Sequence, residues 1–133
     1  MVSLVALLTV LASAPSPSDS VRSDNDIREV VLRHAAVVRG CYETEGLRRN
    51  SALSGTIEVE LRILPVGRVD SVVVVRSELT GPGTREVTDC IIRVARNWRF
   101  ERGPFGVEDI VLPFILKPER NASHDSADDS RRG

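Results

Sequence analysis

The chain has 133 residues, of which 41% are apolar and 28% are charged, the composition of a globular protein rather than a fibrous or wholly disordered one. Eighteen basic and nineteen acidic side chains leave a net charge of −1, which excludes the strongly basic surface typical of nucleic-acid-binding proteins. Nineteen valines and only five aromatic residues indicate a β-rich core built from small branched side chains.

The two ends of the chain differ from its middle. Residues 1–14 form an apolar run that turns into small residues, which predicts a secretory signal peptide with cleavage favoured after Ala12. The alternative is an N-terminal helix of the fold. Residues 15–25, which begin with a Pro-Ser run, are predicted to be a flexible linker. Residues 119–133 have too little apolar surface to offset the entropy of ordering and are predicted to be disordered.

Residues 26–118 remain for one folded domain, which begins with an amphipathic helix. Its apolar stripe recurs at steps of three and four residues and comprises Ile27, Val30, Val31, His34, Val37, Val38, Cys41 and Tyr42. Asp26 is expected to cap this helix, with Glu29 completing a capping box. Gly46 is expected to end it.

A β-hairpin is predicted next. Polar residues alternate with four apolar ones in its first strand, which are Ile57, Val59, Leu61 and Ile63. Residues 64–67 contain proline and glycine in the order that favours a tight turn. The partner strand covers residues 69–75, with Val72 and Val74 facing inward and a bulge at residues 70–71.

A second helix and a third strand complete the domain. Thr84 is expected to cap the helix, whose apolar stripe comprises Val87, Cys90, Ile91, Val94, Ala95 and Trp98. In the strand, the alternating apolar residues are Ile110, Leu112, Phe114 and Leu116. Pro113 cannot donate a hydrogen bond to a neighbouring strand, so this strand is expected at an edge of the sheet.

These elements predict an α+β domain with two layers and the order α-β-β-α-β. Strands joined by a tight turn must run antiparallel, so the sheet is expected to be a three-stranded antiparallel one. Both helices are expected on the same face of it, because charged residues alternate on the other face.

The only two cysteines, Cys41 and Cys90, lie on the apolar stripes of the two predicted helices. An even number of cysteines behind an export signal predicts a disulfide between them, and the alternative is a pair of buried free thiols. His34 lies two helical turns from Cys41, about 10 Å along the axis, which is too far to activate the sulfur. We interpret it as a core or boundary histidine and expect no catalytic residue, metal ligand or cofactor.

A string of particular residues between Ile27 and Leu116 adds to this pattern. It comprises Cys41-Tyr42-Glu43, Leu53, Gly55, Ile63, Pro65, Gly67, Val69, Ser77, Leu79, Cys90-Ile91, Trp98, Phe100 and Pro113-Phe114. The string resembles the TonB C-terminal-like superfamily, specifically the AgmX/PglI C-terminal domain type. The resemblance implies a periplasmic domain that takes up a partner peptide at a sheet edge. It implies that the last strand binds the partner, at Ile110, Val111, Leu112, Phe114 and Ile115.

We therefore expect a non-enzymatic, periplasmic or secreted protein-binding module that engages an envelope protein or peptide segment. No nucleic-acid or small-molecule partner is expected. About ten consecutive apolar residues cannot cross a bilayer core that needs roughly 20 in a helix, so no transmembrane span is expected. The alternative function is a structural or self-associating component of a cell-envelope or motility assembly.

Overall fold

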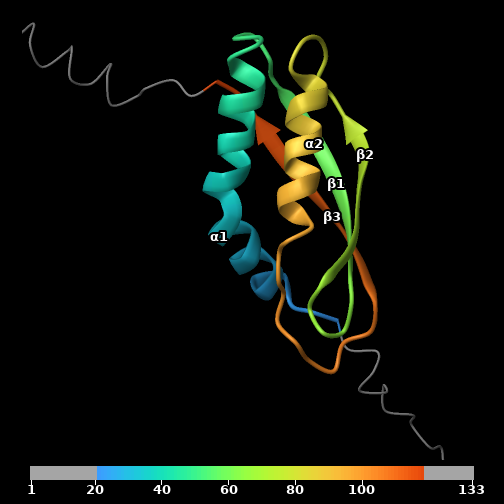
Figure 1. The fold of residues 1–133 in the computed structure, drawn as a ribbon. Helices are drawn as coiled ribbons and strands as arrows, with labels where there is room; N and C mark the ends of the chain where they lie inside the picture. The colour runs from blue at the N-terminus through green and yellow to red at the C-terminus, as the bar shows by residue number, and fades with distance from the viewer. Residues whose placement is uncertain (1–20, 119–133) are drawn as a thin grey trace, which may run out of the picture.

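The computed structural model describes residues 21–118, and Figure 1 shows two helices packed against a three-stranded sheet. The elements in chain order are α1 (Asp24–Cys41), the π-helical segment η2 (Tyr42–Leu47), β1 (Gly55–Ile63), β2 (Val69–Ser77), α2 (Thr84–Ala95) and β3 (Glu108–Leu116). The predicted α+β class and element order are therefore confirmed. The predicted signal peptide, linker residues 15–20 and the C-terminal tail lie outside the described residues.

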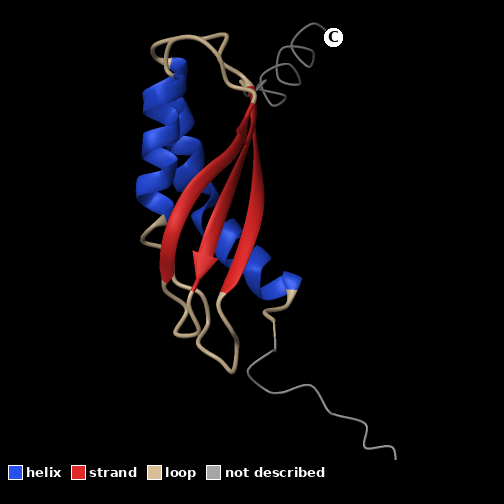
Figure 2. Ribbon diagram, turned by 90° about the vertical axis from the view of Figure 1, so that its right-hand side faces the viewer, coloured by secondary structure: helices blue, strands red, loops and turns tan. Residues whose placement is uncertain are grey.

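β1 is the central strand of an antiparallel sheet with the order β2-β1-β3. Both helices cover the same face of this sheet, as predicted (Figure 2). β3, which contains Pro113, is an edge strand, and this also agrees with the prediction. A sheet tolerates proline at an edge because no neighbouring strand there depends on its missing N–H group. β2 forms the opposite edge.

The β1–β2 hairpin contains the predicted bulge. Asp70 has no partner on β1, so the register shifts by one residue at this point. A second shift, which the sequence did not predict, leaves Val75 without a partner. Val72 is buried and Val74 is half-buried, and both belong to or pack against the core, as expected.

The core lies between the helices and the sheet. Its central wall is β1, whose inward side chains are all completely buried, namely Ile57, Val59, Leu61 and Ile63. Trp98 is fully buried between two rings: His34 of α1 stacks on it at a centroid distance of 5.3 Å, and Phe114 of β3 meets it edge-on at 6.3 Å. His34 therefore packs at the core boundary, as the sequence suggested.

A disulfide joins the end of α1 to α2. Cys41 and Cys90 are both buried, and their Cα atoms are 5.7 Å apart. This confirms the predicted bond and excludes the alternative of two free thiols. Because 49 positions separate the two residues, the bond closes a loop that contains the whole β1–β2 hairpin.

Both predicted helix caps are wrong. α1 begins at Asp24 because the Ser23 hydroxyl accepts a hydrogen bond from the backbone N–H of Asp26 at 3.2 Å and so caps the helix earlier. α2 is preceded by Gly83, which takes the capping position that we had expected for Thr84. Gly83 has φ of 89°, a left-handed conformation that glycine adopts without the strain of a side chain.

The role expected for Gly46 also needs correction. α1 passes directly into η2, which ends one residue after Gly46, and Gly46 does not adopt a left-handed conformation. Glycine is required here by close packing, since an added Cβ would lie 2.6 Å from Val87 Cγ2 and 2.9 Å from Leu53 Cδ2. η2 therefore lies directly against α2.

We expect replacement of both cysteines (C41A/C90A) to lower the free energy of unfolding by roughly 4 kcal/mol, because the open chain gains the entropy of the released loop. Urea denaturation measures the change. Wild-type protein treated with a reducing agent should lose a similar amount. A loss of less than about 1 kcal/mol in the double variant would contradict a stabilising role for the bond.

We expect G46A to lower the free energy of unfolding by roughly 1–3 kcal/mol, because Val87 and Leu53 must move to admit a methyl group. G40A is the matched control in α1, since no atom lies within 4 Å of its added Cβ. It should be neutral or stabilise by up to about 1 kcal/mol. Equal denaturation midpoints for the two variants would overturn the close-packing explanation.

Candidate functional site

The two edges of the sheet differ in regularity. β3 pairs with β1 over nine consecutive residues, from Gly55–Leu116 to Ile63–Glu108, without any shift in register. β2 pairs with β1 across two shifts. Bulges bend an edge strand and are one of the devices by which proteins prevent pairing with another chain. β3 is therefore the edge that offers a regular template for an additional strand.

The middle of the β3 edge lacks one hydrogen-bond donor. In an edge strand, the main-chain groups of alternate residues point toward the neighbouring strand and away from it. Because β3 stays in register with β1 through Pro113, we infer that the Pro113 nitrogen points outward. The N–H groups of Val111 and Ile115, two residues to either side, then point outward as well and are available to a partner.

The structure divides the five predicted contact residues between two faces of β3. Phe114 is buried and Ile110 and Leu112 are half-buried, and all three belong to or pack against the core. Val111 and Ile115 are exposed, by 49% and 70%. Of the predicted set, only these two present side chains to a partner, while the other three hold the strand in place.

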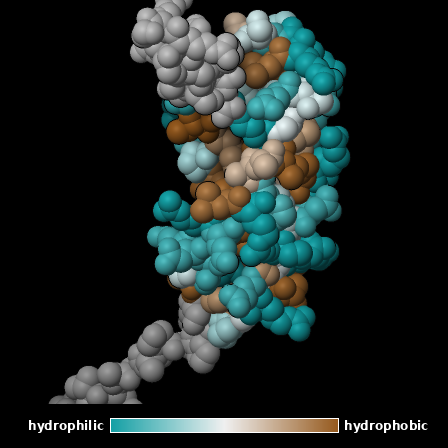
Figure 3. Space-filling view, turned by 90° about the vertical axis from the view of Figure 1, so that its left-hand side faces the viewer, coloured by the Kyte–Doolittle hydropathy of each residue, from teal (hydrophilic) through white to brown (hydrophobic). Residues whose placement is uncertain are grey.

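A groove of about 280 Å³ runs along β3 on the helical side of the sheet. Its lining comes from α1 and β3 and comprises Val31, Ala35, Val38, Arg39, Pro113, Phe114, Ile115 and Leu116. Figure 3 looks at this side of the molecule and shows apolar residues gathered around a hollow in a largely hydrophilic surface. Leu32, 62% exposed, extends the apolar flank of α1.

Sequence reasoning missed the α1 side of this groove. The signal was present, because Ala35 widens the apolar stripe of α1 beside Val31 and Val38. These residues become one wall of a groove only because α1 packs beside β3 in the tertiary structure.

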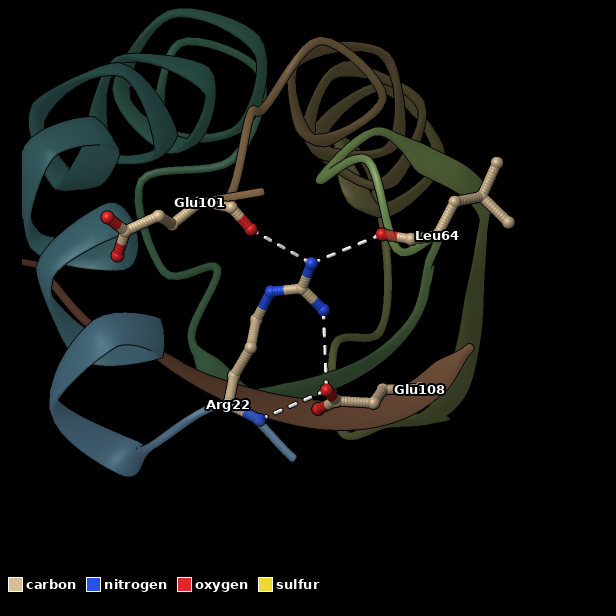
Figure 4. A network of polar contacts seen from close by, with 4 residues as sticks. All are labelled: Arg22, Leu64, Glu101 and Glu108. Carbon is tan, nitrogen blue, oxygen red and sulfur yellow. Dashed lines mark hydrogen bonds and ion pairs between the residues drawn. The ribbon is translucent and has the colours of Figure 1, made fainter. Parts of the chain in front are cut away.

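Arg22 fixes the beginning of β3 from within the protein interior (Figure 4). Its side chain is completely buried and forms an ion pair with Glu108, the first residue of β3, with Nη1 3.3 Å from Oε1. Its Nη2 donates to the carbonyl oxygens of Leu64 (3.1 Å) and Glu101 (3.0 Å). The guanidinium group also lies 4.5 Å from the ring centroid of Phe105.

This network corrects the expected linker boundary. Residues 22–25, which the sequence analysis placed in the linker, belong to the folded part of the chain, since Arg22 is buried and α1 begins at Asp24. A lone arginine in a polar stretch gives no sequence signal for such a position. Only the tertiary structure brings three distant segments around it.

The other end of β3 is held by Arg39 of α1. Its Nη2 donates to the carbonyl oxygen of Lys117 at 3.2 Å, and its Nε donates to Glu43 at 3.1 Å. The ring of Tyr42 lies 5.7 Å below the same guanidinium group. Burial raises the pKa of Tyr42, and the charge of Arg39 lowers it by less. β3 is therefore fixed at both ends while its outer edge stays open.

Within residues 21–118, no group of three or more His, Cys, Asp or Glu side chains is placed to hold a metal ion. In the same range, no helix combines the length and apolar character needed to cross a membrane.

Comparisons with known proteins find similarity among solved structures. No family model matches the chain, and no curated protein matches it. Among solved structures, the chain is similar to the NMR solution structure of the TonB-CTD of Helicobacter pylori, with 12% sequence identity and a TM-score of 0.47. The alignment covers 77% of this chain and 100% of that one.

We expect R22M to lower the free energy of unfolding by roughly 3 kcal/mol, because it leaves the carboxylate of Glu108 without its partner in a nearly buried position. R33M is the control, since the Arg33–Glu29 pair is largely exposed and should contribute less than about 0.5 kcal/mol. Thermal and urea unfolding measure both. The double variant R22M/E108Q should recover part of the loss, and no recovery would contradict the unpaired-charge explanation.

Proposed function

We propose that this chain is a protein-binding module that receives an extended partner segment on the open edge of β3. The observation that carries the proposal is the unbroken register of β3 along nine residues, beside an apolar groove and opposite a bulged edge. The disulfide supports a location outside the cytoplasm, because such bonds persist in oxidising compartments. We propose the periplasm or the extracellular space, and a role without catalysis.

The edge and the groove would act together. A strand added beside β3 would pair with the outward main-chain groups of Val111 and Ile115, each hydrogen bond contributing about 0.5–1.5 kcal/mol. Its side chains would alternate between the two faces of the sheet. Those on the helical side would enter the groove beside Val31 and Ala35. An apolar partner segment is therefore favoured over a charged one.

The anchoring of β3 supports binding without a large ordering cost. Arg22 holds its first residue and Arg39 holds the carbonyl that follows its last residue. A strand that is already fixed loses little conformational entropy when a partner pairs with it. The AgmX/PglI-type assignment, which rests on the residue string in the sequence, stays a prediction.

Self-association through the same edge is the alternative, since any open edge can pair with a second copy. Pro113 disfavours it. In a symmetric antiparallel pair of β3 strands each copy contributes its own proline, so two donors are missing instead of one. A foreign segment loses only one hydrogen bond at this position.

We expect V111P and I115P to weaken partner binding about fivefold each, because each removes one outward donor while leaving the β1–β3 hydrogen bonds in place. P113V adds a donor and should strengthen binding by a similar factor. Each variant also carries a photo-crosslinking residue in place of Ala35, which lies beside the groove. The yield of partner adducts in cells then measures how strongly each variant binds.

The controls for this experiment separate main-chain pairing from side-chain contact. V111T and I115T change the same side chains but keep both N–H groups, so their adduct yields should stay close to that of the wild type. A crosslinker at the exposed Arg85 of α2 should give no such adduct. Equal yields from V111P and V111T, with near-ultraviolet circular dichroism showing both folded, would reject strand addition at β3.

A further inference from the structure

The groove between α1 and β3 contains the ring of Phe114 in its lining. This ring meets Trp98 edge-on at a centroid distance of 6.3 Å, so it is held in place from the core side. Val31 and Ala35 of α1 line the same groove. Ala35 is exposed, and Figure 3 shows a hollow among apolar residues on this side of the molecule, so the groove opens to solvent.

The groove has more room than one small aliphatic side chain needs. Its volume is about 280 Å³. An apolar cavity of about 150 Å³ is already large enough to take up a benzene molecule. A side chain with one ring or two fused rings therefore fits the groove, whereas an alanine or valine side chain would leave most of it unfilled.

The register of β3 determines which residue of an added strand would enter the groove. Residues that lie directly opposite each other on neighbouring strands point to the same face of the sheet. Phe114 is buried and points to the helical side, so a partner residue opposite it points to that side as well. The partner residues opposite Pro113 and Ile115 point to the outer face. One partner side chain is thus placed over Phe114.

The lining of the groove favours an uncharged ring over a charged side chain. A charged group would have to leave water for a mainly apolar lining, which costs free energy. Arg39 is the charged residue of the lining, and it already binds Glu43 and the carbonyl oxygen of Lys117. Its guanidinium group lies 5.7 Å from the ring centroid of Tyr42, and a second ring could lie against it in the same way.

Residues 1–133 have no ring of their own to place in the groove. The segments outside the described residues, 1–20 and 119–133, contain no Phe, Trp or Tyr. Phe105 lies under the guanidinium group of Arg22, and the other four aromatic side chains are buried, namely Tyr42, Trp98, Phe100 and Phe114. A second copy paired along β3 would offer only Phe114, which its own core holds. The ring must therefore come from a different chain.

We propose that the groove selects partner segments with one aromatic side chain, at the position that pairs with Phe114. The proposal rests on the proposed strand addition at β3 and names the kind of segment that it accepts. Main-chain pairing would give affinity for any extended segment, and the groove would distinguish among such segments. Contact between the incoming ring and that of Phe114 contributes about two- to tenfold in affinity beyond the area that the rings bury.

The test uses the full chain and three synthetic peptides of equal length, built from threonine and valine, whose central residue is tryptophan, leucine or alanine. NMR titration gives the dissociation constants and the amide shifts of Val111 and Ile115. The tryptophan peptide should bind about tenfold more tightly than the alanine peptide, with the leucine peptide between them. It should also shift the methyl resonances of Val31 and Ala35.

A matched pair of variants tests whether the groove causes this preference. A35D places a carboxylate in the groove and should weaken binding of the tryptophan peptide about tenfold, to the level of the alanine peptide. A36D makes the same change at the next residue of α1, which is exposed and does not line the groove, and should keep the preference. Near-ultraviolet circular dichroism checks that both variants remain folded.

The amide shifts separate failure of this inference from failure of strand addition. Equal affinities of the tryptophan and alanine peptides, with Val111 and Ile115 shifted by both, would overturn the aromatic preference and leave strand addition standing. A preference that A35D and A36D change equally would also overturn it. If none of the peptides shifts these amides, both the inference and strand addition at β3 are rejected.

Discussion

The disulfide between Cys41 and Cys90 is the constraint on which the rest of the domain depends. The core has a single tryptophan and few other aromatic residues, and most of its buried side chains are aliphatic. The covalent bond fixes the end of α1 against α2. This keeps Trp98 between the ring of His34 on α1 and that of Phe114 on β3, and so sets how both helices lie on the sheet.

The position of α1 in turn makes β3 a usable edge. α1 provides one wall of the groove beside β3, and Arg39 on α1 holds the end of that strand. At the other end, Arg22 joins Glu108 to the hairpin and to the loop after α2. A strand that is fixed at both ends and regular between them can accept a partner without first becoming ordered. β2, which two bulges interrupt, cannot offer the same template.

The free edge and the free face of the sheet limit what the domain can bind. Pro113 allows β3 to remain an edge but lowers its tendency to pair with a second copy of itself. On the outer face, Glu60 of β1 lies between Val73 of β2 and Val111 of β3 and prevents them from forming one continuous hydrophobic surface. Both features reduce unspecific association of the sheet.

The sequence by itself determined the element types, the order α-β-β-α-β, the bulge at Asp70, the edge position of β3 and the cysteine pair. These features follow from local periodicity, from the missing N–H of proline and from the placement of both cysteines on apolar stripes. The tertiary structure alone decided the rest: the burial of Arg22, the packing reason for Gly46, the capping by Ser23 and Gly83, and the groove between α1 and β3. Most of these features depend on contacts between segments far apart in the chain. The two caps depend on which of several neighbouring residues with similar capping propensity begins the helix. Local pattern carries no information about such contacts, because they are set by how the helices pack on the sheet.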